Sequence, residues 1–107
     1  MAKSLTKETA DKLLGNVPSD KVFWLSDGQT LQNLADLDRV LKGMKKEVFQ
    51  HHVNKDKNDF KNWVNDIIGD TDLAGKLDKA KSKAEVAKAV KARINELVKA
   101  TKKSMTI

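Results

Sequence analysis

The sequence predicts an all-α fold: a compact bundle of five or six helices with one short extended segment at residues 22–25. Apolar residues recur at three- and four-residue steps along most of the 107 residues, as on the inward face of a helix. Aromatic residues make up only 5% of the chain, which leaves little material for a large sheet. We therefore expect residues 1–107 to form a single helical domain. Helix-capping residues divide the apolar stretches at Thr6, Thr30, Asn58–Asp59, Asp70 and Ser82.

The first third of the chain contains one short helix and the extended segment. Thr6 caps a helical pattern that ends at Gly15. Pro18 disfavours helix in the residue before it, so a connector follows. The tetrapeptide VFWL at residues 22–25 is continuously apolar and rich in β-formers, and Gly28 closes the turn after it. No second β-rich run exists in the sequence, so this segment is either irregular or paired with a short piece elsewhere.

Leucines at helical spacing define the next part of the chain. Thr30 is predicted to cap a helix that ends near Gly43. The inward residues of this helix are Leu31, Leu34, Leu37, Leu41 and Met44. A short helix over residues 45–53 follows, and the polar residues 54–57 carry the chain through a loop.

Residues 49–74 hold three of the five aromatic side chains and both histidines. A helix over residues 60–68 ends at Gly69, and Asp70 caps the helix that follows. His52 lies on the apolar side of its own short helix, so we expect a buried, hydrogen-bonded histidine. The residues predicted to have structural roles are Phe49, His52, Asp59, Phe60, Trp63, Gly69 and Asp70, with Asp59 and Asp70 acting as caps.

The last third of the chain carries the positive charge. Lys and Arg number 11 against 12 acidic residues up to Gly75, but 10 against 3 from Lys76 onward. Ser82 and Glu85 match a capping box, which predicts a long basic helix over residues 82–103. The apolar stripe of this helix consists of Val86, Val90, Ile94, Leu97 and Val98.

Composition and motifs argue against several classes of function. The chain has no cysteine, which excludes disulfides and thiolate metal sites and favours a reducing, cytoplasmic location. No apolar run approaches the roughly 20 residues of a membrane span, so we expect no membrane partner. His51 and His52 point about 100° apart on a helix, and the aspartates within residues 58–72 fit neither an EF-hand nor a glycosidase pair. We therefore expect no enzymatic activity, no metal site and no cofactor.

Two kinds of binding remain open for the C-terminal helix. The first hypothesis is contact of its apolar stripe with a protein partner or with a second copy of the chain, although the same stripe could simply complete the core. Its cations are suited to non-specific binding of a DNA or RNA backbone. Lysines outnumber arginines nineteen to two, which is also typical of a solvated helix face. The residues predicted for nucleic-acid contact are Lys83, Lys88, Lys91, Arg93, Lys99, Lys102 and Lys103.

Three stretches of the sequence stand out together: FWLSDG at residues 23–28, HHVN at residues 51–54 and NDFKNWVNDIIGDTDLA at residues 58–74. With the leucine-spaced helix from Leu31, they resemble a domain-of-unknown-function family found mainly in archaea and candidate-phylum bacteria. The resemblance covers residues 22–77. It implies a small cytoplasmic helical domain with no agreed activity, and the helices before and after this core lie outside it.

Overall fold

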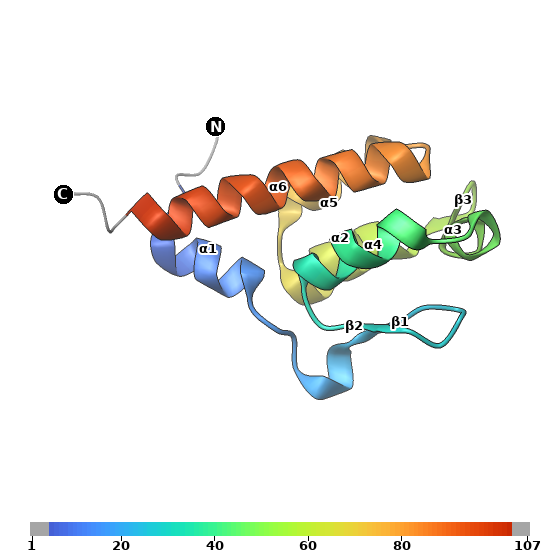
Figure 1. Ribbon diagram of the computed structural model, residues 1–107, viewed down its shortest axis with the longest axis horizontal. Coiled ribbons are helices and arrows are strands. Elements are labelled where there is room, and N and C mark those ends of the chain that lie inside the picture. The colour runs from blue at the N-terminus through green and yellow to red at the C-terminus, as the bar shows by residue number, and fades with distance from the viewer. Residues whose placement is uncertain (1–4, 104–107) are drawn as a thin grey trace.

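The structure of the chain, a computed structural model, describes residues 5–103 apart from the side chain of Lys103. Six α-helices account for most of this region, which confirms the predicted all-α fold (Figure 1). Their bounds are α1 Lys7–Leu14, α2 Leu34–Gly43, α3 Lys46–His52, α4 Asp59–Trp63, α5 Thr71–Lys79 and α6 Lys83–Lys103. A 3₁₀ turn, η1, covers Ser19–Lys21, and a π-helical turn, η2, continues α4 over Val64–Ile68.

Two small antiparallel hairpins accompany the helices. Strand β1 (Phe23–Trp24) pairs with β2 (Thr30–Leu31), and β3 (Val53–Asn54) pairs with β4 (Lys57–Asn58). The first hairpin contains the predicted extended segment, and its partner is the short piece of chain that follows the turn. The second hairpin lies where the sequence predicted only a loop, at residues 54–57.

Helix α6 is the longest helix and extends along one side of the molecule (Figure 1). It packs against α1 near its C-terminal end and against α2 and α5 over the rest of its length. Helix α3 and the β3–β4 hairpin lie at the other end of the molecule, near the start of α6 (Figure 1). None of the helices within residues 5–103 combines the length and the apolar character needed to cross a bilayer.

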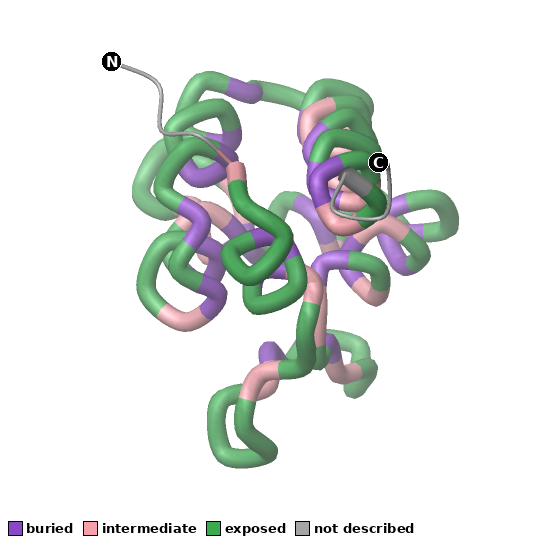
Figure 2. Tube along the Cα trace, turned by 90° about the vertical axis from the view of Figure 1, so that its left-hand side faces the viewer, coloured by how far each residue is buried: buried purple, intermediate pink, exposed green. Residues whose placement is uncertain are grey.

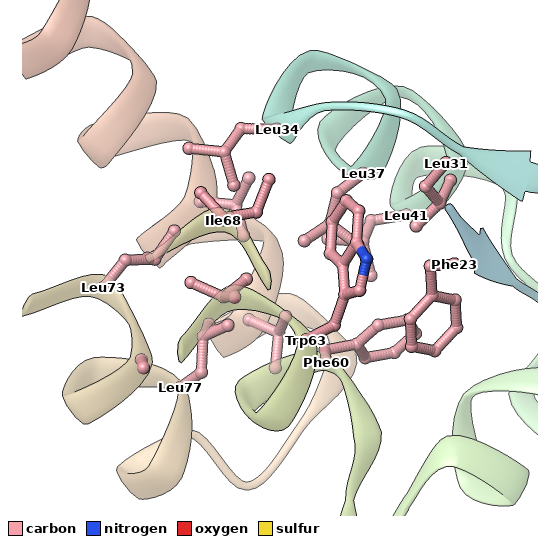
Figure 3. Close-up of a cluster of buried hydrophobic side chains, with 14 of the residues drawn as sticks. Phe23, Leu31, Leu34, Leu37, Leu41, Phe60, Trp63, Ile68, Leu73 and Leu77 are labelled. Carbon is pink, nitrogen blue, oxygen red and sulfur yellow. The ribbon is translucent and has the colours of Figure 1, made fainter. Parts of the chain in front are cut away.

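The buried apolar side chains form one cluster. Figure 2 marks the buried positions along the chain in purple. Leucines of α2 and α5 lie around the rings of Phe23, Phe60 and Trp63 (Figure 3). The rings of Phe23 and Phe60 stack with their centres 5.2 Å apart, and Nε1 of Trp63 donates to the Lys21 carbonyl oxygen at 3.0 Å. Each fully buried leucine or phenylalanine contributes roughly 1.5–3 kcal/mol. Packing of these side chains therefore holds the short helices in place.

The start of α2 differs from the sequence prediction. Thr30 does not cap this helix, because its backbone belongs to β2, where Thr30 pairs with Trp24. Asn33 is the cap instead, and its side chain accepts a hydrogen bond from the Asp36 amide at 2.8 Å. Leu31 is nevertheless fully buried, as the leucine spacing predicted, although it points inward from a strand and not from a helix.

The start of α4 also needs a correction. Asn58, and not Asp59, is the N-cap: the side-chain oxygen of Asn58 accepts from the Lys61 amide at 3.0 Å. The amide nitrogen of the same side chain donates to the Leu77 carbonyl oxygen at 3.0 Å, which ties α4 to α5. Asp59 is the first helical residue, so its carboxylate is available for other partners.

Gly69 and Asp70 have the local roles that the sequence predicted. Gly69 has a φ of 88°, a left-handed conformation that ends the preceding helix. The amides of Gly69 and Asp70 both donate to the Val64 carbonyl oxygen, at 2.8 and 3.1 Å. The carboxylate of Asp70 then caps α5 by accepting from the Leu73 amide at 3.1 Å.

The start of α6 has the predicted capping box. The amide of Glu85 donates to the Ser82 hydroxyl oxygen at 3.2 Å, and the Glu85 carboxylate accepts from the Ser82 amide at 3.1 Å. The same carboxylate oxygen also accepts from the Lys81 amide at 2.7 Å. Glu85 therefore satisfies two backbone donors at the beginning of the helix.

Candidate nucleic-acid interface

Four exposed lysines lie along the outer side of α6, and we call them the lysine stripe: Lys88, Lys91, Lys99 and Lys102. At 100° per residue they fall within one arc of about 80°, and at 1.5 Å per residue they extend over about 21 Å. Asn95 lies on this arc between Lys91 and Lys99, and it is exposed and carries no charge. The stripe therefore consists of two pairs of lysines on one side of the helix, separated by about 12 Å.

The carboxylates of α6 are engaged elsewhere and do not neutralise the stripe. Glu85 accepts from backbone amides in the capping box, and Glu96 accepts from Nη1 of Arg93 at 3.3 Å. Within the described part of the chain, none of the four stripe lysines has a carboxylate oxygen within 4.0 Å. The ammonium groups are thus left to solvent or to an anionic ligand.

Two of the residues predicted for nucleic-acid contact, Arg93 and Lys83, do not belong to this surface. Arg93 is buried, with 5% of its surface exposed, and does not point outward. Lys83 is half-buried, and its Nζ donates to the Met44 carbonyl oxygen at 2.7 Å. Both residues therefore serve contacts within the chain, which corrects their assignment to the interface. Lys103 ends α6, but its side chain lies outside the described residues.

Helical spacing explains the position of Arg93. It follows Val90 by three residues and precedes Leu97 by four, so it lies on the buried face of α6. Its Nε donates to Oδ2 of Asp70 at 2.8 Å and its Nη2 to Oδ1 at 3.0 Å. Burial alone lowers the pKa of Arg93, but the hydrogen bonds and charge of Asp70 outweigh it and raise the pKa above its ordinary value. The charged guanidinium of Arg93 is thus used inside the fold, against Asp70.

The apolar stripe of α6 is used inside the chain. Val86, Val90 and Leu97 are at most 1% exposed and belong to the core, while Ile94 and Val98 are half-buried. Helices α1, α2 and α5 cover this face. Three of the five residues of the apolar stripe are therefore used within the core, and only Ile94 and Val98 keep part of their surface exposed.

His52 is buried and has a hydrogen-bond partner at each ring nitrogen. Nδ1 lies 3.0 Å from Oδ2 of Asp59, and Nε2 accepts from the Ser26 amide at 3.0 Å. Because an amide only donates and a carboxylate only accepts, the ring is neutral with its proton on Nδ1. Lys57 also contacts Oδ2 of Asp59, at 3.0 Å. His52 thus fastens the turn after β1 to α4, which agrees with the buried, hydrogen-bonded histidine that the sequence predicted.

The aromatic residues expected to be structural lie in the core. Phe49, Phe60 and Trp63 are each at most 6% exposed. The rings of Phe49 and Phe60 stack at 6.3 Å, and the ring of His52 lies 5.5 Å from that of Phe60. The three aromatic side chains belong to the core, and Figure 3 shows Phe60 and Trp63 beside Phe23.

Two further features were missed by sequence reasoning. Trp24 on β1 is 66% exposed, although it belongs to the continuously apolar tetrapeptide at residues 22–25. Alternation along the strand turns Phe23 inward and Trp24 outward. The second feature is a group of lysines around two adjoining hollows, to which Lys46, Lys61 and Lys81 contribute. These lysines come from separate segments, so no local pattern in the sequence brings them together.

No group of three or more His, Asp or Glu side chains that could hold a metal ion occurs among residues 5–102. Comparisons of the chain with protein-family models, with curated proteins and with solved structures give no match. The resemblance of residues 22–77 to a domain-of-unknown-function family therefore stays a prediction.

Proposed function

We propose that this chain is a non-enzymatic binding module that holds the phosphate backbone of a nucleic acid on the lysine stripe. The observation that supports this most strongly is the arrangement of four exposed lysines on one side of α6, with the carboxylates of the helix engaged elsewhere. Such a surface releases counterions from nucleic acid and binds its backbone. A cytoplasmic location belongs to the same proposal and is supported by the absence of cysteine.

The chemistry of the stripe favours binding without sequence preference. Lysine is a compact charge that contacts phosphates, whereas the planar fork of arginine reads the edges of bases. The two arginines of the chain are both engaged: Arg93 with Asp70, and Arg39 with Asp36 at 3.1 Å. The stripe itself contains no arginine and no aromatic ring. We therefore expect affinity for duplex DNA or RNA of any sequence.

The test is a fluorescence-anisotropy titration of the full chain with two unrelated DNA duplexes at two salt concentrations. We expect equal affinity for both duplexes and a steep loss of affinity between 50 mM and 200 mM salt, by a factor on the order of 10² or more for four or more phosphate contacts. Absence of binding at the lower salt concentration would contradict the proposal that the chain binds nucleic acid.

A second candidate is self-association through the first hairpin, and Trp24 supports it. A tryptophan with 66% of its surface exposed is unusual, and tryptophan is enriched among the residues that dominate protein interfaces. Sedimentation at rising protein concentration tests this candidate. We expect the mass to increase for the native chain and to remain that of a monomer for Trp24→Ser. A native chain that stays monomeric excludes self-association by this route.

A further inference from the structure

Two hollows adjoin each other where the β3–β4 hairpin meets the connection between α5 and α6. The first, which we call the polar hollow, has a volume of about 670 Å³ and lies between the hairpin, α4 and that connection. The second, which we call the apolar hollow, has a volume of about 590 Å³ and lies between α3 and the start of α6. Val53, Asn54 and Lys81 line both hollows, so the two are parts of one groove.

The polar hollow has an excess of positive charge. Lys55, Lys57, Lys61 and Lys81 line it, against the carboxylates of Asp56 and Asp78. Lys57 is held by Asp59 at 3.0 Å. For the other three lysines, the described residues offer no carboxylate oxygen within 4.0 Å. Lys55, Lys61 and Lys81 thus give the lining a net charge of one positive unit against Asp56 and Asp78. A phosphate group has the charge and the acceptor oxygens that lysine side chains bind.

The apolar hollow has a different lining. The half-buried Val53 is the main apolar residue of its lining, and Phe49, which is 6% exposed, contributes only a small part. The charged residues around them are Lys46, Lys81 and Lys83. Among the residues that the structure describes, no carboxylate lines this hollow. The Nζ of Lys83 donates a hydrogen bond to the Met44 carbonyl oxygen at 2.7 Å, so this ammonium group already has a partner within the chain. A flat ring next to a phosphate-bearing group fits this combination of apolar and cationic surface.

We propose that this groove binds a free nucleotide with two or three phosphates. The phosphates lie in the polar hollow near Lys55, Lys61 and Lys81, and the base lies in the apolar hollow against Phe49 and Val53. Lys81 lines both hollows and is therefore placed where the phosphates join the nucleoside. Neither hollow includes a residue of the lysine stripe, so this inference does not depend on nucleic-acid binding by α6.

Isothermal titration calorimetry of the full chain at low salt tests the inference with ADP, inorganic pyrophosphate and adenosine as separate probes. We expect one ADP per chain, weaker binding of pyrophosphate, and weaker binding still of adenosine. The variant Lys61→Gln/Lys81→Gln should bind ADP at least about tenfold more weakly, because each lysine supplies a hydrogen bond to a charged group. Lys76→Gln/Lys79→Gln is the matched control, since it removes the same charge and both lysines are exposed on α5 and line neither hollow. In NMR spectra, ADP should shift the methyl signals of Val53.

Several results would overturn the inference. One is no heat of binding with millimolar ADP in a chain shown to be folded. Another is ADP binding that Lys61→Gln/Lys81→Gln leaves unchanged. Equal affinity for ADP and pyrophosphate, with no shift of the Val53 methyl signals, would contradict the placement of the base in the apolar hollow. Binding of an aspartate-rich peptide with the affinity of ADP would show a general preference for anions and contradict a nucleotide site. Binding of DNA duplexes to the lysine stripe is measured in a separate titration. Failure of ADP to bind the groove would therefore not contradict nucleic-acid binding by α6.

Discussion

Arg93 donates two hydrogen bonds to the carboxylate of Asp70, at 2.8 and 3.0 Å. Both side chains are buried, with 6% of Arg93 and 1% of Asp70 exposed. The same carboxylate accepts from the Leu73 amide at the start of α5. One side chain therefore caps α5 and also anchors the middle of α6. This contact fixes the helix that carries the lysine stripe to the rest of the fold.

The first prediction concerns this buried pair. Arg93→Met removes one partner and leaves the Asp70 carboxylate buried without its cation, so we expect a loss of about 3–5 kcal/mol in the free energy of unfolding. Arg39→Met is the matched control, because Arg39 pairs with Asp36 at the surface and such pairs contribute about 1 kcal/mol or less. Urea denaturation measures both variants. Equal, small losses would show that the buried pair is not an anchor.

The second prediction separates two glycines. Gly69 has a φ of 88° and open space around the position of a Cβ, so Gly69→Ala introduces backbone strain without a clash and costs about 1–2 kcal/mol. Gly75 lies inside α5, also with open space, so Gly75→Ala should stabilise the chain by up to about 1 kcal/mol. Thermal unfolding of the two variants should give shifts of opposite sign. Shifts of the same sign would contradict the assigned helix boundary.

The third prediction compares the neighbouring histidines. His52→Ala deletes a buried ring and both of its hydrogen bonds, and we expect a loss of about 2–4 kcal/mol. His51 is exposed, so His51→Ala should change stability by less than about 0.5 kcal/mol. Nitrogen NMR of the native chain at neutral pH should find the His52 proton on Nδ1. A proton on Nε2 would rule out the hydrogen bond from Ser26.

The fourth prediction is a pH dependence. Burial raises the pKa of Asp59, but hydrogen bonds with His52 and Lys57 outweigh it and hold the pKa below its ordinary value. A carboxyl with a lowered pKa stabilises the fold above the pKa of the unfolded chain and loses this effect as the pH falls through the folded value. The stability gap between the native chain and Asp59→Asn should therefore be largest near neutral pH and shrink below about pH 4. A gap that widens on acidification contradicts the direction of this shift.

Local signals in the sequence were sufficient for several elements of the fold. The Ser82–Glu85 capping box, the stop at Gly69 and the cap at Asp70 involve residues a few positions apart, so their partners were visible in the sequence. Asn33 was missed as the cap of α2 because Thr30 is a good capping residue by itself. The pairing of β1 with β2 that removes Thr30 from the helix depends on a turn and on tertiary packing.

The lysine stripe could be predicted from the sequence, whereas the groove could not. Four of the seven predicted cationic residues form the lysine stripe, since they share one side of a single helix. The interior position of Arg93 was also predictable, because its spacing from Val90 and Leu97 puts it on the apolar side. The groove was not predictable, because Lys46, Lys61 and Lys81 approach one another only when α3, α4 and the start of α6 are packed together.

The salt dependence of DNA binding by the native chain and by two quadruple variants tests the central claim most directly. One variant changes Lys88, Lys91, Lys99 and Lys102 to Gln, and the control changes the exposed Lys12, Lys21, Lys45 and Lys76 to Gln, which gives the same net charge. If the stripe holds the backbone, the slope of log affinity against log salt falls in magnitude by up to about 3.6 for the first variant, and much less for the control. Equal slopes for the two variants would mean that only net charge matters and would contradict a binding surface on α6.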